Sequence, residues 1–581
     1  MRMFSCGSAL VAIALSCVPQ MMAQDSPVQT PDPAASSVAS VSTTQSTPAD
    51  PLPSTFNDVI ERTVQREHLF LAQMRHLHPM VETYVQNFKA QNSTDIVPVN
   101  DHYFLGRLDM SEGTEDTSFM GQPGFGKRLM VKLTGAYSLH YLPLGFAEMV
   151  ILDNDFEKRY YNFNFVRREF LGEVRCLVID VDPKPGQRIP RFKGRIWVED
   201  QEYNIVRFNG TYSPQPKSAV FFHFDSWRLN MRPGTWLPAY IYTEESNLKT
   251  GLSKTLHFKA QTRLWGYDLK GLNKNEEFTQ ILVDSPQSVR DQSDTASDAS
   301  PVMAQRLWEK QAEDNSIERL QKVGLLAPPG EVDKVLCTVV NNVMVTNNID
   351  LQGDIQCRVL LTAPLESFTI GHTIVISRGL LDVLPDEASL AMVLSHELAH
   401  IVLGHKLDTS LAFSDKMLFP DQDSFERFDF KRDPADEQAA DAKALELLKN
   451  SPYKDKLGNA GLFLKALQER APDLPNLIRP HLGNCLAAGK SMRMQDLMTS
   501  APALDEKRLD QIAALPLGGR IKVDPWSDQV ELSKTKPVAL TSAREKMEFE
   551  ITPVFPYLTR LTTGGEKVAL TTSAPTAPVQ K

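Results

Sequence analysis

The spacing of apolar and polar residues changes along the chain, and each change predicts a different kind of element. Residues 56–88 carry apolar side chains at helix-compatible intervals. From about 100 to 285 apolar and polar residues alternate instead, as in the strand-like segments 176–183, 194–199 and 205–210, with turn-rich sequence between them. This pattern predicts a helix followed by one curved antiparallel sheet.

Helical spacing returns after the polar segment 286–300. Residues 303–323 and 332–342 are predicted helices, whereas 357–361 and 367–376 are predicted strands rich in β-branched residues. The predicted fold class is therefore α+β and multidomain. An N-terminal antiparallel β-rich domain is expected to precede a mainly helical domain with a small sheet.

The N-terminus has the pattern of an export signal. Arg2 gives a positive start, residues 9–15 form a short apolar centre, and 21–23 fit a cleavage site. That centre is too short to span a bilayer, and no later run reaches about 18 apolar residues. We expect a periplasmic or secreted protein with no transmembrane segment in the mature chain. A buried N-terminal helix is the alternative, and a lipid anchor at Cys17 is not favoured because the preceding residues fit the lipoprotein pattern poorly.

Composition marks the boundaries between the predicted parts. A segment rich in Pro, Ser and Thr without periodicity follows the signal and is typical of a disordered linker. The predicted parts are a signal peptide at 1–24, a linker at 25–54, the β-rich domain at 55–285, a second linker at 286–300, the helical domain at 301–517, and a C-terminal extension and tail at 518–581.

Charge and cysteine content narrow the partners and the chemistry. The formal net charge is −10 and no Lys/Arg-rich run occurs, so nucleic acid is not an expected partner. Of six cysteines, four lie beyond the signal, and export permits disulfides. Cys337 and Cys357 are the favoured pair, and free thiols are the alternative. The four are Cys176, Cys337, Cys357 and Cys485.

The apolar run 390–403 contains the motif His-Glu-x-x-His at 396–400. His396 and His400 are one helical turn apart, so both imidazoles can bind a single Zn²⁺ ion. Glu397 is placed to take a proton from a water on that ion. A chance match on an ordinary helix is the alternative, so a third ligand decides the interpretation.

Two kinds of third ligand are known in zinc peptidases with this motif. One is a His after a Gly turn, but Gly404 and His405 each fall one position short of that spacing. The other is a Glu from a second helix with an Asp one turn later, and Glu437 and Asp441 have this spacing. Asp441 would then accept the free N–H of a ligand imidazole.

Three stretches together resemble metallopeptidase family forty-eight: the segment 369–381, HELAHIVLGH from 396, and EQAAD from 437. This family includes HtpX, the CAAX prenyl proteases and the BepA-type periplasmic proteases, all gluzincins. The resemblance covers roughly 300–515. It implies a zincin domain with one zinc ion per chain, bound by His396, His400 and Glu437, with Glu397 as general base and Asp441 in contact with a ligand.

The resemblance also implies roles outside the metal site. Part of 365–376 would pair with the substrate backbone, and Arg508 would stabilise the oxyanion. The family often has a His-Pro pair before this Arg, but Ala501 stands here instead of His, which affects turnover and not metal binding. We interpret His405 as a packing residue. The segment 406–433 is either a lid or a loop that packs against the domain.

The β-rich half is similar in pattern to LolA/LolB-type carriers, which bind lipoprotein acyl chains. The similarity depends on the hairpin at 197–200 and the segment 236–238. The alternative is a generic β-domain that docks on the peptidase.

These observations predict an exported zinc-dependent endopeptidase that acts on protein or peptide substrates. A role in envelope protein quality control, with lipoprotein association, combines the two resemblances. The alternative function is a non-catalytic protein that binds lipid, lipoprotein or unfolded chains and has a structural zinc site. An intact Glu397 argues against this alternative, because a structural site does not need a base.

Overall fold

The structure is a computed structural model of the chain. Several predicted features lie outside its described residues: the signal peptide with Cys17, both linkers except residues 53 and 54, most of the lid, Cys485 and Arg508. The described residues are 53–90, 96–110, 115–118, 146, 149–214, 221–249, 255–269, 301–351, 353–405, 430, 432–479, 482–483, 486–488, 491–505, 520–523, 529–532 and 549–561.

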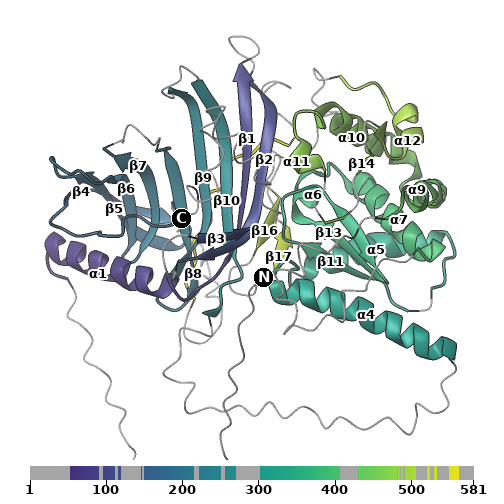
Figure 1. The fold of residues 1–581 in the computed structure, drawn as a ribbon, viewed down its shortest axis with the longest axis horizontal. Helices are drawn as coiled ribbons and strands as arrows, with labels where there is room; N and C mark the ends of the chain where they lie inside the picture. Colours follow the sequence, from purple (N-terminus) through teal and green to yellow (C-terminus); the bar gives the residue numbers. More distant parts are fainter. Residues whose placement is uncertain are drawn as a thin grey trace, which may run out of the picture. The chain divides into compact units, whose positions relative to one another are not determined.

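A large antiparallel sheet dominates the N-terminal half (Figure 1). Its ten described strands lie in the order β3-β2-β1-β10-β9-β8-β7-β6-β5-β4. Most neighbours follow one another in sequence, as hairpin connections require. The strands are β1 (Met80–Ala90), β2 (Ile96–Asp109), β3 (Glu115–Ser118), β4 (Tyr161–Leu171), β5 (Val174–Pro183), β6 (Arg191–Glu199), β7 (Ile205–Ser213), β8 (Phe224–Arg232), β9 (Thr235–Lys249) and β10 (Thr255–Trp265).

The helix predicted over 56–88 is shorter in the structure. The helix α1 (Phe56–Met74) begins with a capping box between Thr55 and Asp58 and ends before β1. β1 pairs on both edges, with β2 and β10, and it is buried on both faces from Met80 to Gln86. Because both faces are covered, its sequence lacks the alternation that identifies a half-exposed strand.

A buried ion pair fastens α1 to the sheet. Arg228 on β8 donates two hydrogen bonds, of 2.7 and 2.8 Å, to the carboxylate of Glu67 on α1. Both side chains are almost fully buried. The guanidinium also lies 3.7 Å from the ring centroid of Phe70. Two parallel hydrogen bonds fix the orientation of the helix as well as its position.

The C-terminal half is mainly helical and contains a small sheet in the order β11-β13-β12, so β12 is an edge strand. β13 pairs in parallel with β11 and antiparallel with β12. The elements are α4 (Pro301–Val323), α5 (Glu331–Thr346), β11 (Gln356–Leu360), β12 (Ser367–Ile370), β13 (Thr373–Ser377), α6 (Arg378–Val383), α7 (Glu387–Leu403), α9 (Pro434–Lys449), α10 (Leu457–Arg470), α11 (Pro475–Ile478) and α12 (Gln495–Ser500). The predicted fold class is confirmed.

The two halves share one hydrophobic cluster, which contains Tyr84 and Trp265 of the sheet together with the cores of α5 and α7. Two buried carboxylates join them by hydrogen bonds. Glu82 accepts from the backbone N–H of Ala363 at 2.6 Å, and Asp101 accepts from that of Leu477 at 2.7 Å. The predicted domain boundaries stay a prediction.

The segment 549–561 lies along the sheet. Gln86 of β1 donates to the carbonyl of Phe549, and Leu558 is buried beside Trp197 and Trp236. A Cβ at Gly172 would lie 2.5 Å from the backbone of Leu558, so glycine is required for this contact.

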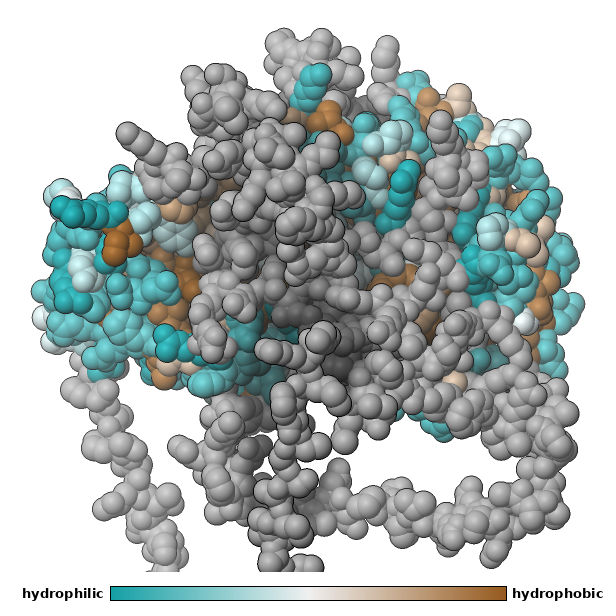
Figure 2. Space-filling model, viewed as in Figure 1, coloured by the Kyte–Doolittle hydropathy of each residue, from teal (hydrophilic) through white to brown (hydrophobic). Residues whose placement is uncertain are grey.

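The thiols of Cys176, Cys337 and Cys357 are free, so the favoured Cys337–Cys357 disulfide is not formed in the structure. Instead, the Cys337 thiol donates a hydrogen bond of 3.6 Å to the carbonyl of Ile355. On the face shown in Figure 2, the described surface is mainly hydrophilic. Within the described part of the chain, no helix combines the length and apolarity needed to cross a membrane.

Candidate metal centre

α7 carries the two histidines of the motif through the core. Asp386 caps its first turn by accepting from the N–H of Ser389, and Gly404 ends it in the left-handed conformation with φ of 70°. Both faces of the helix are buried from Ala388 to His400, with Leu390 the exception. The apolar run seen in the sequence is therefore a core helix.

α9 brings a carboxylate to the two imidazoles. His396, His400 and Glu437 are all buried, and one ligand atom from each lies within 4.8 Å of the others. The Nε2 atoms of the two histidines are 3.1 Å apart. The Glu437 oxygens lie 3.2 Å from Nε2 of His396 and 3.6 Å from Nε2 of His400.

These separations fit zinc. Ligands about 2.0–2.1 Å from a tetrahedral Zn²⁺ ion are about 3.3 Å from one another. Both carboxylate oxygens of Glu437 are buried, and neither accepts a well-formed hydrogen bond from the described residues, although Oε2 forms an ion pair with Arg493. Two imidazoles and a carboxylate are also the donor set of catalytic zinc sites that keep a position open for water.

Each histidine has a partner at its other ring nitrogen. Nδ1 of His396 lies 2.9 Å from Oδ1 of Asp441, although the two atoms do not form a well-aligned hydrogen bond, and the predicted role of Asp441 stays a prediction. Nδ1 of His400 lies 2.9 Å from Nδ1 of His405, whose Nε2 is 3.6 Å from Asp436. Such partners fix the orientation of a ligand imidazole and leave Nε2 directed at the cluster.

The contact of His405 was missed, because the helical wheel directs this residue away from His400. Gly404 breaks the helix and turns the chain, and the N–H of His405 then donates to the carbonyl of His400. A glycine before a histidine at a helix end is the sequence signal that could have indicated it.

The protonation state of His400 suits metal binding. Burial, followed by the positive charges of nearby residues, keeps the pKa of His400 well below its ordinary value. The ring is therefore neutral near pH 7, and neutral imidazole is the form that binds metal.

Glu397 is completely buried beside the cluster. Its Oε1 accepts a hydrogen bond of 2.7 Å from the hydroxyl of Ser367, and its Oε2 accepts one of 2.6 Å from the hydroxyl of Thr369. Both donors belong to β12. The carboxylate therefore lies between the metal helix and the edge strand.

Arg493 is a further residue that the sequence did not indicate. Its guanidinium forms an ion pair with Glu437 and lies 3.0 Å from Nε2 of His396. Burial lowers the pKa of Arg493 to about 10, so it stays positively charged near pH 7. No motif surrounds it. The expected arginine, Arg508, lies outside the described residues.

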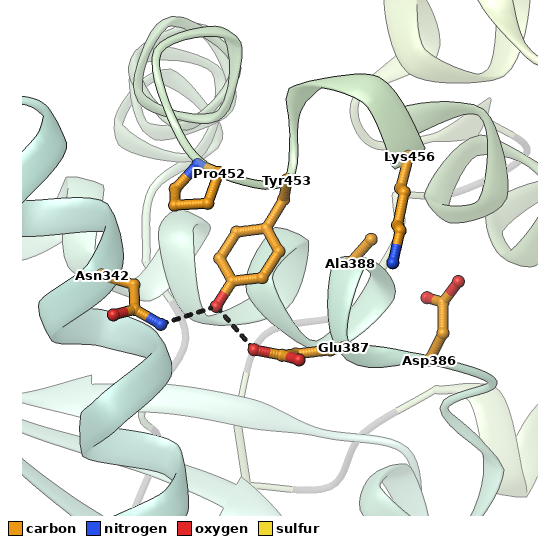
Figure 3. Close-up of a pocket in the computed structure, with 7 residues that line it drawn as sticks. All are labelled: Asn342, Asp386, Glu387, Ala388, Pro452, Tyr453 and Lys456. Carbon is orange, nitrogen blue, oxygen red and sulfur yellow. Dashed lines mark hydrogen bonds between the residues drawn. The ribbon is translucent and has the colours of Figure 1, made fainter.

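A separate polar cavity of about 270 Å³ lies at the start of α7 (Figure 3). There Tyr453 donates to Glu387 at 2.8 Å and accepts from Asn342 at 3.1 Å. Nine helical positions, about 14 Å, separate Glu387 from His396, the nearer histidine, so this cavity is not part of the metal cluster.

The structure therefore has a candidate metallopeptidase centre. It consists of two histidines of one buried helix and a carboxylate from a second helix, with the carboxylate of Glu397 next to His396 in the sequence. Residues 335–419 match the model of peptidase family M48. The match includes the His-Glu-x-x-His helix and supports a metallopeptidase, as the sequence resemblance predicts.

Several solved structures are similar to part of the chain, including the following two, whereas none of the curated proteins matches it. One is a DUF1329 family protein from Desulfovibrio piger, with 10% identity over 35% of this chain and 92% of that chain and a TM-score of 0.18. The other is a LolA superfamily protein from Nitrosomonas europaea, with 11% identity over 35% of this chain and 92% of that chain and a TM-score of 0.17.

Proposed function

We propose that the protein is an exported zinc-dependent endopeptidase. The observation that carries the proposal is the convergence of His396, His400 and Glu437 with Glu397 beside them. A structural zinc site is usually closed by four protein ligands, whereas three ligands with an adjacent carboxylate are typical of hydrolytic sites. The match to peptidase family M48 over 335–419 supports the same class.

A zinc ion bound by these residues would supply the Lewis acid that activates water and polarises the scissile carbonyl. Glu397 accepts the proton of the attacking water and then delivers it to the leaving amine. Asp441 and His405 hold the two imidazoles in place. Arg493 supplies positive charge against the tetrahedral oxyanion, a role that the sequence resemblance gives to Arg508.

We place the activity in the cell envelope, on polypeptide substrates. The signal-like N-terminus and the resemblance to BepA-type proteases support export and a quality-control role. The LolA/LolB-like sequence pattern of the β-rich half supports the same setting. This half shares a hydrophobic core with the helical half.

The decisive variant is Glu397→Gln, which keeps the shape of the side chain and removes the base. We expect it to retain one zinc ion per chain in metal analysis and to lose cleavage of fluorescein-labelled casein. Glu446→Gln on the exposed face of α9 is the matched control. A Glu397→Gln protein that cuts casein at the parental rate would overturn the proposal. A parent with zinc but without cleavage would favour the non-catalytic binding protein.

A further inference from the structure

The buried hydroxyls of β12 are unusual for the core of a small sheet. Ser367 is 4% exposed and Thr369 is completely buried, and both are on the same face of the strand because they are two residues apart. The opposite face is apolar, with Phe368 stacked on Phe430 at a centroid distance of 4.5 Å. A buried hydroxyl is costly unless it is hydrogen-bonded.

Both hydroxyls donate to one carboxylate. Ser367 binds Oε1 of Glu397 and Thr369 binds Oε2, so each oxygen has its own donor. A carboxylate that accepts at both oxygens from one rigid strand has little freedom to rotate about its last torsion. The guanidinium of Arg432 donates to the carbonyl of Thr369 at 2.9 Å and holds the strand from the other side of the peptide unit.

We propose that Ser367 and Thr369 are positioning residues for Glu397, which fix the general base beside the metal ligands through β12. This inference depends on the proposed function for its catalytic meaning. Without these donors, the carboxylate could rotate and would spend less time in reach of the attacking water. Because a base acts on the chemical step and does not bind substrate, the loss should appear in kcat and leave KM and zinc content unchanged.

The experiment uses the full-length zinc-loaded protein with fluorescein-labelled casein. Thr369→Val removes the hydroxyl at constant shape, and Thr369→Ser restores it. We expect kcat to fall about tenfold in Thr369→Val and in Ser367→Ala, and Thr369→Ser to stay close to the parent. Thr338→Val, on the exposed face of α5, controls for loss of a threonine hydroxyl. A Thr369→Val protein with unchanged kcat, or with raised KM alone, would overturn the proposal.

A second measurement separates this inference from the endopeptidase function. The urea unfolding midpoints of Thr369→Val, Glu397→Ala and the double variant form a cycle that needs no turnover. We expect the two changes to be clearly non-additive. Additive changes refute the hydroxyl–carboxylate contact whether or not casein is cleaved. Non-additive changes in a protein that does not cleave casein reject the endopeptidase and retain the contact.

Discussion

Asp441 offers the most direct test of how the metal centre is held. Its Oδ1 lies 2.9 Å from Nδ1 of His396, and its Oδ2 accepts from the backbone N–H of Met494 at 3.3 Å. The carboxylate is therefore fixed by a second contact and can orient the ring. Asp441→Asn keeps the shape but removes the negative charge that makes the imidazole a stronger ligand.

Loss of such a contact typically weakens metal binding about 10- to 100-fold, which is about 1.4–2.7 kcal/mol. We expect the zinc dissociation constant of Asp441→Asn to rise within this range, measured by competition with a chromophoric chelator near pH 7.5. His405→Ala should have a smaller effect, because a neutral imidazole polarises its partner less than a carboxylate does. Asp455→Asn, on an exposed turn, is the control. If Asp441→Asn bound zinc as tightly as the parent while Glu437→Gln bound it much more weakly, the proposed role of Asp441 in orienting His396 would be refuted.

Two further predictions concern stability and thiol chemistry. Glu67→Gln leaves the buried charge of Arg228 without its partner, so urea unfolding should show that the free energy of unfolding falls by about 3–5 kcal/mol. The control Glu61→Gln, on the exposed face of α1, should leave it almost unchanged. A fall below about 1 kcal/mol in Glu67→Gln contradicts this prediction. The hydrogen bond from a neighbouring thiol lowers the pKa of Cys337 to about 7, whereas burial raises that of Cys176 to about 12. Iodoacetamide should therefore alkylate Cys337 before Cys176, and the rate at Cys337 should rise through pH 7 because the thiolate is the nucleophile. Equal alkylation rates at Cys337 and Cys176 would count against the lowered pKa of Cys337.

The parts of the site that the sequence predicts are those encoded locally. The run 390–403 of α7 is apolar apart from Ser395 and the motif itself, and His396 and His400 are brought together by helical periodicity alone. Glu437 and Asp441 are one turn apart on α9, so a second local motif suffices for them. The contact of these two residues with the histidines is a tertiary contact that spacing alone does not predict. The resemblance to a known family predicts it instead.

The parts that the sequence does not predict depend on contacts between distant segments. Arg493 reaches Glu437 from a short loop without any motif, so no spacing identifies it. The hydroxyl donors to Glu397 lie 28 and 30 residues before it, on a strand that looks like ordinary β-branched sequence. The strand β1 looked helical because burial on both faces removed its alternation.

Contacts of the same distant kind connect the large sheet to Glu397, the proposed general base. Asp101 of β2 accepts from the N–H of Leu477, and the carbonyl of Leu477 accepts from the N–H of Leu365 at 2.7 Å. Two residues further on, Ser367 begins β12 and donates to Glu397. Three of the links are hydrogen bonds between buried groups, and the backbone from Leu365 to Ser367 joins the second to the third. Breaking one of these hydrogen bonds would leave a polar group unsatisfied at considerable cost. The β-rich half therefore supports the edge strand as well as contacting the helical half, because three hydrogen bonds and a short piece of backbone connect β2 to the carboxylate of Glu397.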